Sequence, residues 1–450
     1  MTAAVLAGCR HASNDLPFGN TRPDVILITI DALRADHLGV YGYDRPTSPH
    51  LDALAREAVV VGSHISQAPY TKASMASLFT GLFPSSHKAY TISRSFSDTM
   101  RGTVSGDLPQ TDVLDPALWT MASAFETAGY QTIGLNTNPF LLKEFGFAKG
   151  FQDYEFLTSG SDLATAPEVI ARALDRIDRR APGRPTFLWM HLMEPHTPYT
   201  PPASVRALFP PRTPPRPAPP DLVPDWMAQG GSLDANFYES LYDGEIRSAD
   251  DALGQLFDGL RKRGMWDRLV LVVTADHGEE FLDHGGFEHN RTLYDEMVHV
   301  PLIVKAPGLP PGRRDVETES VDLAPTLARA AGATPPAGLA GADIWPELRG
   351  TSGGEPWAFA ERPGEIYMLR TREWKFISNL EAHHELYHLT TDPHERENVA
   401  PFEPDRTREM RNRLAGVLAR AYEAGRNVRG QLAPISPRVL SRLKSLGYVR

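Results

Sequence analysis

Several apolar runs in the sequence end abruptly in acidic or histidine residues. Three runs have this pattern most clearly: residues 25–30 before Asp31, residues 269–273 before Asp276 and His277, and residues 187–192 before His196. Each run is rich in large apolar residues and does not alternate between apolar and polar positions. Such runs are typical of strands that are buried on both faces of a mostly parallel sheet.

Amphipathic segments between the runs predict helices. The first begins at Ser48 with Pro49 in its first turn, and a long one, residues 234–263, ends before Gly264. Alternating strands and helices predict an α/β fold, with a large, mostly parallel sheet sandwiched by helices. Ligands of such sheets bind at the carboxyl ends of the strands. The polar residues that follow the three runs fall there.

The pattern changes after residue 350. Residues 357–377 alternate as antiparallel strands do, and a helical tail follows. We therefore expect a smaller C-terminal α+β subdomain. The predicted organisation is a leader over residues 1–22, a catalytic domain over residues 23–350 and the subdomain over residues 351–450.

Two polar segments are predicted to be loops. Residues 91–116 have little periodicity, and residues 198–224 are rich in proline and therefore stiff and extended. The second segment is either a surface spacer or, because it follows His196 closely, a wall of the substrate cleft.

Composition narrows the range of partners. The chain has 450 residues and a formal net charge of -10, which argues against nucleic-acid binding through a basic surface. An anionic substrate would need a local positive centre, which a metal ion can supply. No apolar run reaches the roughly 18–20 residues of a membrane span, so we expect no transmembrane segment.

The single cysteine, Cys9, excludes an intramolecular disulfide and a cysteine-based metal site. It closes the sequence VLAGC, which resembles the lipobox of bacterial lipoproteins. The residues before it lack the basic region and the full apolar length, about 7–15 residues, of a signal peptide. Either the true start lies further upstream or the match is chance. A lipid anchor at Cys9 would place the protein in the periplasm or cell envelope, and without it we expect a soluble protein.

Residues 69–81, PYTKASMASLFTG, are mostly small or hydroxylated. They predict a helix that opens after Pro69. Small side chains let a backbone approach a ligand closely, and the first turn of a helix offers free N–H groups to an anion. Thr71 stands at this helix start, so its hydroxyl is a candidate nucleophile.

The strand-end residues Asp31, Asp276 and His277 predict a metal site. A lone carboxylate at a strand end is more often a helix cap or a turn residue. Carboxylate and imidazole groups that converge from separate strands, however, match the ligands of a divalent ion. Thr71 either completes this site, with its hydroxyl pKa lowered by the metal, or caps its helix, and the two roles are compatible.

Ordered blocks of the sequence resemble the sulfatase family of the alkaline-phosphatase superfamily. The blocks include DVILITIDALRADHLGVYGY, PYTKASMASLFTGLFPSSH, FLWMHLMEPHTPY, LYDEMVHVPLIV and ELYHLTTDPHERENVA. The resemblance covers about residues 23–450, and blocks in the correct order are stronger support than any single motif. The resemblance implies an alkaline-phosphatase-like fold, metal ligands at Asp31, Asp276 and His277, a nucleophile at Thr71 and a substrate-contacting histidine at His196.

The nucleophile block departs from the family pattern. Family sulfatases carry Cys or Ser, followed by Pro, Ser and Arg, and convert the first residue to formylglycine. Here the block starts at Thr71 and has Met75 at the arginine position. Oxidation of threonine would give a ketone, so we expect an unmodified Thr71 that attacks the ester and forms a covalent intermediate. Two further departures are Ala32 in place of a second aspartate and Asn290, beside His289, in place of a lysine.

Four further residues are candidates for substrate contacts or acid catalysis. Lys72 and His87 flank the nucleophile helix and could supply the charge that Met75 lacks, although a solvent-facing position suits Lys72 better. His284 and His289 lie in one loop, and each is either a surface residue, a leaving-group acid or a second metal ligand. In the expected site, Thr71, His196 and His289 are catalytic, and Lys72, His87 and His284 bind substrate.

We therefore expect a metal-dependent hydrolase of sulfate esters, acting on an anionic substrate such as a sulfated glycan. One divalent ion is expected among Mn, Zn, Mg and Ca, and the imidazole of His277 favours Mn²⁺ or Zn²⁺ over Ca²⁺. Two alternatives stay open: a phosphodiesterase or phosphoryl transferase of the same superfamily, and an inactive protein that binds sulfated glycans. The expected site offers one metal ion and His196 but no arginine after the nucleophile, so its positive charge is modest. Such a site suits a sulfate monoester or phosphodiester better than a dianionic phosphate monoester.

Overall fold

The computed structural model describes residues 17–19, 21–90, 110–160, 162–220, 222–223, 232–351, 357–379 and 383–445. Cys9 and the sequence that resembles a lipobox lie outside these residues, so the lipid anchor and the cell-envelope location stay predictions. Within the described residues, no helix combines the length and the apolar character that crossing a bilayer requires.

An eight-stranded sheet forms the centre of the molecule. In spatial order its strands are β13 (Gly312–Glu319), β2 (Val59–Ile65), β12 (Leu302–Lys305), β9 (Val270–Ala275), β1 (Val25–Ile30), β8 (Thr186–Leu192), β4 (Gln131–Asn136) and β5 (Asp153–Phe156). β1 is parallel to both of its neighbours, β8 and β9, whereas β12 is antiparallel to β9 and β2. The prediction of a large, mostly parallel sheet is confirmed.

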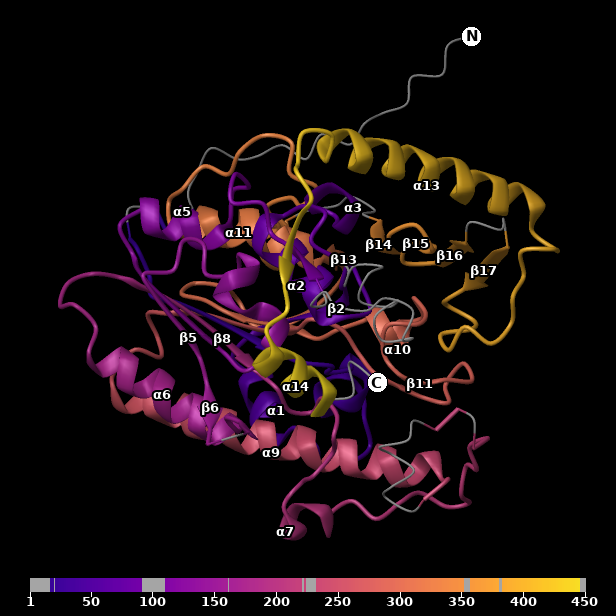
Figure 1. Cartoon of the computed structure of the whole chain (residues 1–450), viewed down its shortest axis with the longest axis horizontal. Helices are drawn as coiled ribbons and strands as arrows, with labels where there is room; N and C mark the ends of the chain where they lie inside the picture. Colours follow the sequence, from indigo (N-terminus) through magenta and orange to yellow (C-terminus); the bar gives the residue numbers. More distant parts are fainter. Residues whose placement is uncertain are drawn as a thin grey trace.

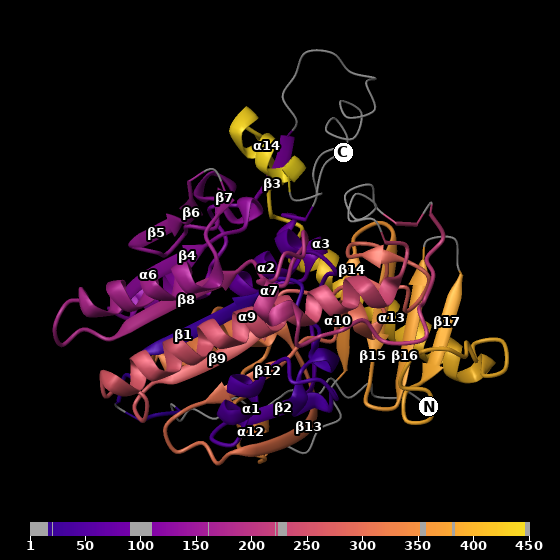
Figure 2. The ribbon, with the colours of Figure 1, turned by 90° about the horizontal axis from the view of Figure 1, so that it is seen from below.

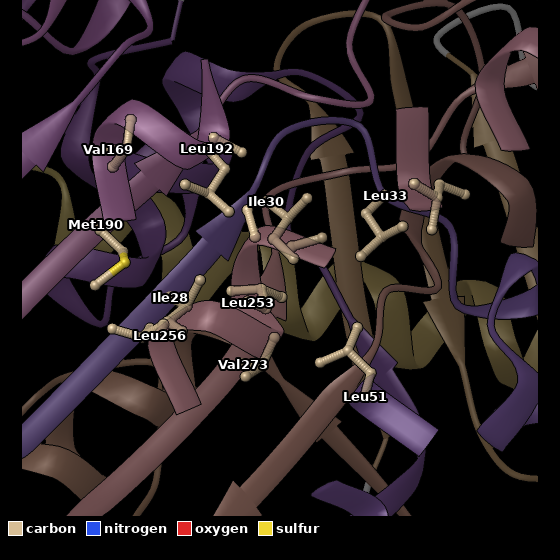
Figure 3. Packing of buried hydrophobic residues seen from close by; sticks show 14 of the residues in the cluster. Ile28, Ile30, Leu33, Leu51, Val169, Met190, Leu192, Leu253, Leu256 and Val273 are labelled. Atoms are coloured by element: carbon tan, nitrogen blue, oxygen red, sulfur yellow. The ribbon is translucent and has the colours of Figure 1, made fainter. Parts of the chain in front are cut away.

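Helices cover both faces of this sheet (Figure 1). One face carries α1 (Pro49–Ala55), α6 (Ala166–Asp178) and α9 (Ala235–Lys262), and the other carries α2 (Thr71–Thr80), α5 (Met121–Thr127) and α11 (Leu323–Ala330). Alternate residues of β1 pack into the two opposite cores: Ile28 and Ile30 into the first, Val25 and Leu27 into the second. Figure 3 shows Ile28 near Leu256 of α9 in the first core. Burial on both faces is why the run is continuously apolar.

The helix that was predicted from Ser48 is shorter than its apolar pattern. It begins at Pro49, as expected, but ends at Ala55, and Val59 already belongs to β2. The Ser48 side chain does not cap the helix; its hydroxyl contacts Asp52 instead. The predicted end of α9 is confirmed, since Gly264 follows it with a φ of +63°, a conformation that favours glycine.

One of the predicted loops contains a strand. β3 (Gln110–Val113) lies in the segment predicted as a loop over residues 91–116, and it pairs with β18 (Gln431–Pro434). Residues 91–109 lie outside the described part of the chain. Among the described residues of the proline-rich segment, the short helix α7 (Ala203–Arg206) is the regular element.

The C-terminal part forms a second, antiparallel sheet of four strands (Figure 2). Its strands are β14 (Ala358–Arg362), β15 (Ile366–Arg370), β16 (Trp374–Asn379) and β17 (His384–His388). The expected alternation is confirmed: Phe359 and Leu369 pack on α13 (Pro404–Ala424), whereas Ala360 and Met368 pack on the body, where Ile65 and Met297 lie. The two parts therefore share cores, and the boundary at residue 350 stays a prediction.

The remaining described α-helices and strands have two to nine residues. They are α3 (Pro84–His87), α10 (Asp295–Val298), α12 (Trp345–Leu348), α14 (Pro437–Ser445), and the strand pairs β6 (Thr158–Ser159) with β7 (Asp162–Leu163) and β10 (Glu280–Phe281) with β11 (Phe287–Glu288).

A buried group of charges joins the C-terminal sheet to the body. The Lys375 ammonium is fully buried and lies 2.7 Å from Asp295 Oδ1 and 2.8 Å from Glu395 Oε1. Arg370 lies 3.2 Å from the same aspartate and 2.6 Å from Glu317 Oε2. Asp295 opens α10 of the body, so these pairs tie β15 and β16 to it.

We expect Lys375→Met to lower the free energy of unfolding by about 3–5 kcal/mol, because removing one partner leaves buried carboxylates uncompensated. Urea unfolding of the variant and the wild type measures this loss. The matched control is Arg408→Met on the exposed face of α13, where the pair with Asp405 is solvated and its loss should leave the urea midpoint unchanged. Equal midpoints for Lys375→Met and the wild type would contradict the prediction.

Candidate active site

The register of the central sheet brings two carboxylates together. Ile30 of β1 pairs with Ala275 of β9, so Asp31 and Asp276 follow side by side at the carboxyl ends of parallel strands. One ligand-type atom from each of Asp31, Asp276 and His277 lies within 4.8 Å of the others, and all three residues are buried. The structure therefore brings together the three residues predicted as metal ligands.

The backbone at Ala32 bends to make this arrangement. Ala32 has a φ of +57°, a left-handed conformation that costs a non-glycine residue about 1 kcal/mol. Its N–H donates to Asp276 Oδ1 at 3.1 Å, and its carbonyl accepts from the Tyr242 hydroxyl of α9 at 2.7 Å. These bonds hold the turn after β1 and orient the Asp276 carboxylate.

Thr71 is the first residue of α2 and its hydroxyl faces the cluster. Thr71 Oγ1 lies 3.3 Å from His277 Nε2 and 3.5 Å from Asp31 Oδ1. The N-cap position belongs to Tyr70, so the alternative in which Thr71 caps the helix is wrong. All ten residues of α2 are buried, which its small side chains permit, and the helix start therefore lies against the strand ends.

Two polar residues that contact Asp31 were not predicted. Asn138, two residues after β4, donates from Nδ2 to Asp31 Oδ2 at 2.7 Å and to Thr71 Oγ1 at 3.3 Å. His191 lies within β8, and its Nε2 is 3.1 Å from Asp31 Oδ2. The available signals were an amide that follows a strand and a histidine inside an otherwise apolar run.

Burial and mutual charge set the electrostatics of the cluster. Burial alone would raise the pKa of Asp31, but interactions with the nearby histidines, first His196, hold it well below its ordinary value. Burial, together with the charge of Asp31, raises the pKa of Asp276 to about 6. Burial opposes protonation of His277, yet Asp276 and Asp31 raise its pKa to about 9. Excess negative charge therefore accumulates here.

Two further predicted residues lie beside the cluster. The imidazole of His289 has its centre 4.5 Å from that of His277 and 5.0 Å from that of His196. His289 Nδ1 lies 3.2 Å from Glu279 Oε1, and the Tyr199 hydroxyl donates to Glu279 Oε2 at 3.0 Å. Burial lowers the pKa of His196 to about 4 and that of His289 to about 3, so both rings are neutral near pH 7.

The three predicted substrate contacts have their described partners elsewhere. Lys72 is buried rather than solvent-facing, with its Nζ on the hydroxyl of Thr111. His87 lies 3.0 Å from Ser77 Oγ through Nε2 and accepts from Ala89 N–H through Nδ1. His284 contacts Glu296 Oε1 at 2.6 Å and the Glu395 carbonyl at 3.1 Å.

Met75 does not face the cluster either. Its side chain is fully buried and packs in the apolar core together with Leu27 and Val272. A helix position that would carry a positive charge in the family pattern therefore contributes to the core instead.

Residues 23–333 match the sulfatase family, and residues 282–423 match the family described as N-sulphoglucosamine sulphohydrolase, C-terminal. The first match covers well over half of the chain. The chain belongs to the sulfatase family.

Similar proteins agree with this assignment. This sulfatase-family chain is 24% identical over 425 residues to the Delta 4,5-hexuronate-2-O-sulfatase of Bacteroides thetaiotaomicron. The aligned region covers 84% of this chain and 85% of the relative. It is also 30% identical over 188 residues to arylsulfatase K of Xenopus laevis. That alignment covers 38% of this chain, and the chain spans only 35% of the relative's length.

Solved structures share the fold. A phosphonate monoester hydrolase of Agrobacterium radiobacter has a TM-score of 0.71 at 19% identity, with 89% of this chain and 96% of that chain covered. A protein solved in complex with its substrate D-glucosamine-2-N,6-O-disulfate has a TM-score of 0.72 at 19% identity, with 90% and 99% covered. The expected alkaline-phosphatase-like fold is thus confirmed.

We expect the stability effect of Lys72→Met to depend on pH. Burial lowers the pKa of Lys72 from 10.5 to about 7, so between these values the unfolded chain binds a proton that the folded chain does not. The stability of the wild type therefore rises with pH over this window, by up to about 1.4 kcal/mol per pH unit, and the burial penalty is complete below it. The free energy of unfolding of the methionine variant, relative to the wild type, should fall as pH rises.

Urea unfolding at about pH 6, 8 and 10 measures this trend. Lys262→Met on the exposed end of α9 is the matched control. A difference between Lys72→Met and the wild type that stays constant from neutral to alkaline pH would contradict the prediction.

Proposed function

We propose that this sulfatase-family protein hydrolyses sulfate esters, with unmodified Thr71 as the nucleophile. The observation that carries the proposal is the position of Thr71 Oγ1, 3.3 Å from His277 Nε2 and 3.5 Å from Asp31 Oδ1 at the start of a buried helix. A hydroxyl in this position points toward the place where the ligand-type atoms converge. Membership of the sulfatase family supports the choice of a sulfate ester.

The residues of the cluster fit one divalent ion. Two carboxylates and an imidazole are a common ligand set, and the nitrogen of His277 favours Mn²⁺ or Zn²⁺ over Ca²⁺. Asp276 Oδ2 is buried and has no hydrogen-bond partner within the described residues. This is expected of an oxygen that binds a metal ion instead. When bound, such an ion supplies positive charge that lowers the pKa of a hydroxyl and offsets the charge on the ester oxygens.

The chain's own groups account for the transfer. Thr71 Oγ1 attacks sulfur as the bond from sulfur to the leaving oxygen breaks, and water later cleaves the threonine sulfate ester. Asn138 Nδ2 donates to Thr71 Oγ1 and so orients its lone pairs. The proton that Thr71 loses goes to the leaving oxygen, and His289 is the proposed carrier, because its ring lies beside that of His277 with Nδ1 3.2 Å from Glu279 Oε1.

We propose a sulfated sugar as the substrate class. The relative that aligns over most of the chain is named for removal of a 2-O-sulfate from a hexuronate, and this supports a sulfated uronate. His196 lies beside His289 and is proposed to contact the sulfate group. A second candidate, hydrolysis of a phosphodiester, is favoured by the unmodified hydroxyl of Thr71, which can attack phosphorus in the same way.

We expect Thr71→Ala to lower kcat for sulfate-ester hydrolysis by roughly ten-thousandfold or more, because a covalent step loses its nucleophile. Ser74→Ala is the matched control, since the Ser74 hydroxyl bonds the Tyr70 and Thr71 carbonyls of the same helix turn. The assay compares a 2-O-sulfated uronate, an aryl sulfate, an aryl phosphodiester and an aryl phosphate monoester. Mass spectrometry of the peptide that contains Thr71 tests whether the residue is unmodified.

Sulfate turnover that survives Thr71→Ala would overturn the assignment of Thr71 as the nucleophile. A kcat/KM that is higher for the phosphodiester than for either sulfate would favour the second candidate. Binding of sulfated polysaccharide without turnover of any ester would instead indicate a binding protein.

We expect Asp276→Asn to weaken Mn²⁺ binding at least about a hundredfold and to abolish turnover, while leaving the metal-free fold intact. An amide oxygen can still accept from Ala32 N–H and His277 N–H, so the turn is retained. Loss of one of two neighbouring buried charges should keep the melting temperature in chelator at or above that of the wild type. Calorimetric titration with Mn²⁺ measures the affinity, and Ca²⁺ binding tighter than Mn²⁺ or Zn²⁺ would contradict the ligand argument.

A further inference from the structure

Three polar side chains form a chain inside the central sheet behind Asp31. Trp189 Nε1–H donates to Thr29 Oγ1 at 3.0 Å, Thr29 Oγ1 lies 2.8 Å from His191 Nδ1, and His191 Nε2 lies 3.1 Å from Asp31 Oδ2. All four side chains are completely buried. The parallel register of β1 and β8 pairs Thr29 with His191.

The donors and acceptors of this chain have one consistent direction. The indole N–H of Trp189 can only donate, so Thr29 Oγ1 is an acceptor there and keeps its own hydrogen for another partner. That partner is His191 Nδ1 at 2.8 Å, since the alternative, the Met190 carbonyl, is 3.4 Å away. A ring that accepts at Nδ1 carries its hydrogen on Nε2 and donates it to Asp31.

The chain also decides which oxygen of Asp31 is available. Asp31 Oδ2 receives Nε2–H of His191 at 3.1 Å and Nδ2–H of Asn138 at 2.7 Å. Asp31 Oδ1 faces the other way, toward Thr71 Oγ1 and His277 Nε2, the latter at 3.4 Å. One oxygen is therefore occupied by two N–H donors, and the other points into the cluster.

We propose that His191 is a positioning residue, oriented by Thr29 and Trp189, that turns Asp31 so that a single oxygen, Oδ1, serves as ligand to the cation. This inference rests on the proposed function, in which Asp31 holds a divalent ion. It explains why a strand core carries three polar groups where Val, Leu and Phe would need no partners. Groups behind a ligand commonly change metal affinity by about 10–100-fold when they are replaced.

The test compares Thr29→Val, which keeps the shape but removes the hydroxyl, with Thr29→Ser, which keeps the hydroxyl. Calorimetry with Mn²⁺ measures affinity, and steady-state assays on an aryl sulfate separate kcat from KM. We expect Thr29→Val to weaken Mn²⁺ binding about 10–100-fold and to lower kcat with little change in KM, and Thr29→Ser to stay within about threefold of the wild type. Urea unfolding confirms that both variants are folded.

A second pair keeps the proposal testable if Thr29→Val does not fold. His191→Gln places an amide N–H near the position of Nε2, so it should retain more Mn²⁺ affinity than His191→Leu, whereas a purely space-filling role would favour leucine. Long-range ¹H–¹⁵N correlation spectra of the metal-free protein, with the His191→Gln spectrum as the assignment control, should place the hydrogen of the His191 ring on Nε2.

A hydrogen on Nδ1 of His191, or Mn²⁺ affinity of Thr29→Val equal to that of Thr29→Ser, would overturn the proposal. Those results leave the proposed function standing as long as the wild type binds Mn²⁺ and cleaves sulfate esters. A wild type that does neither, with the hydrogen still on Nε2, would instead remove the proposed function and leave His191 as a donor to an aspartate that holds no ion.

Discussion

The site depends on the burial of two carboxylates side by side at the ends of parallel strands. The pairing of β1 with β9 makes Asp31 and Asp276 neighbours, and both are excluded from water. Like charges in such a place raise each other's pKa unless donors or cations surround them. Asp276 has a raised pKa, about 6, and Asp31 escapes this only because histidines surround it. The neighbouring groups described above offset this excess of negative charge by donating hydrogen bonds to the carboxylates.

The surrounding backbone also helps to offset the negative charge of the two carboxylates. Ala32 adopts a left-handed conformation so that its N–H points at Asp276, and Tyr242 of the long helix α9 fixes the turn. On the opposite side, α2 lies against the strand ends because its small residues allow burial all round. The N-terminal turn of this helix adds the positive end of its dipole, about half a charge, to the same region. Core packing and site chemistry are thus satisfied by the same residues.

Strand-end patterns were sufficient to predict that Asp31, Asp276 and His277 lie together, and the small residues after Pro69 predicted the helix that starts at Thr71. Parallel strands of one sheet bring their ends to one edge, so sequence position alone implies proximity there. The same logic missed His191, because a residue inside a strand gives no sign of which neighbour it faces. Asn138 was missed because an amide after a strand is usually a turn residue.

The direction of side chains on fully buried helices could not be predicted from the sequence either. Lys72 of α2 contacts Thr111, and His87 of the short buried helix α3 contacts Ser77 of α2. An apolar periodicity normally tells which face of a helix is buried, and α2 has none because every face is. The strand β3 was invisible for a different reason: its partner β18 lies about 300 residues further along the chain, and short polar strands have no pattern of their own.

The placement of Met75 limits how much positive charge the substrate can meet. In the apolar core it contributes none, and the lowered pKa values of His196 and His289 make both rings neutral near pH 7. Among the described residues of the proposed site, an anionic ester would meet a divalent ion shared with two carboxylates and His277, the half charge of a helix terminus and the N–H groups of neutral side chains. A second negative charge on the substrate would find no further cationic partner among these described residues, and an unpaired charge in a buried site costs several kcal/mol. A singly charged sulfate or phosphodiester is therefore favoured over a phosphate monoester, whatever the geometry at the reacting atom, where sulfur and phosphorus are alike.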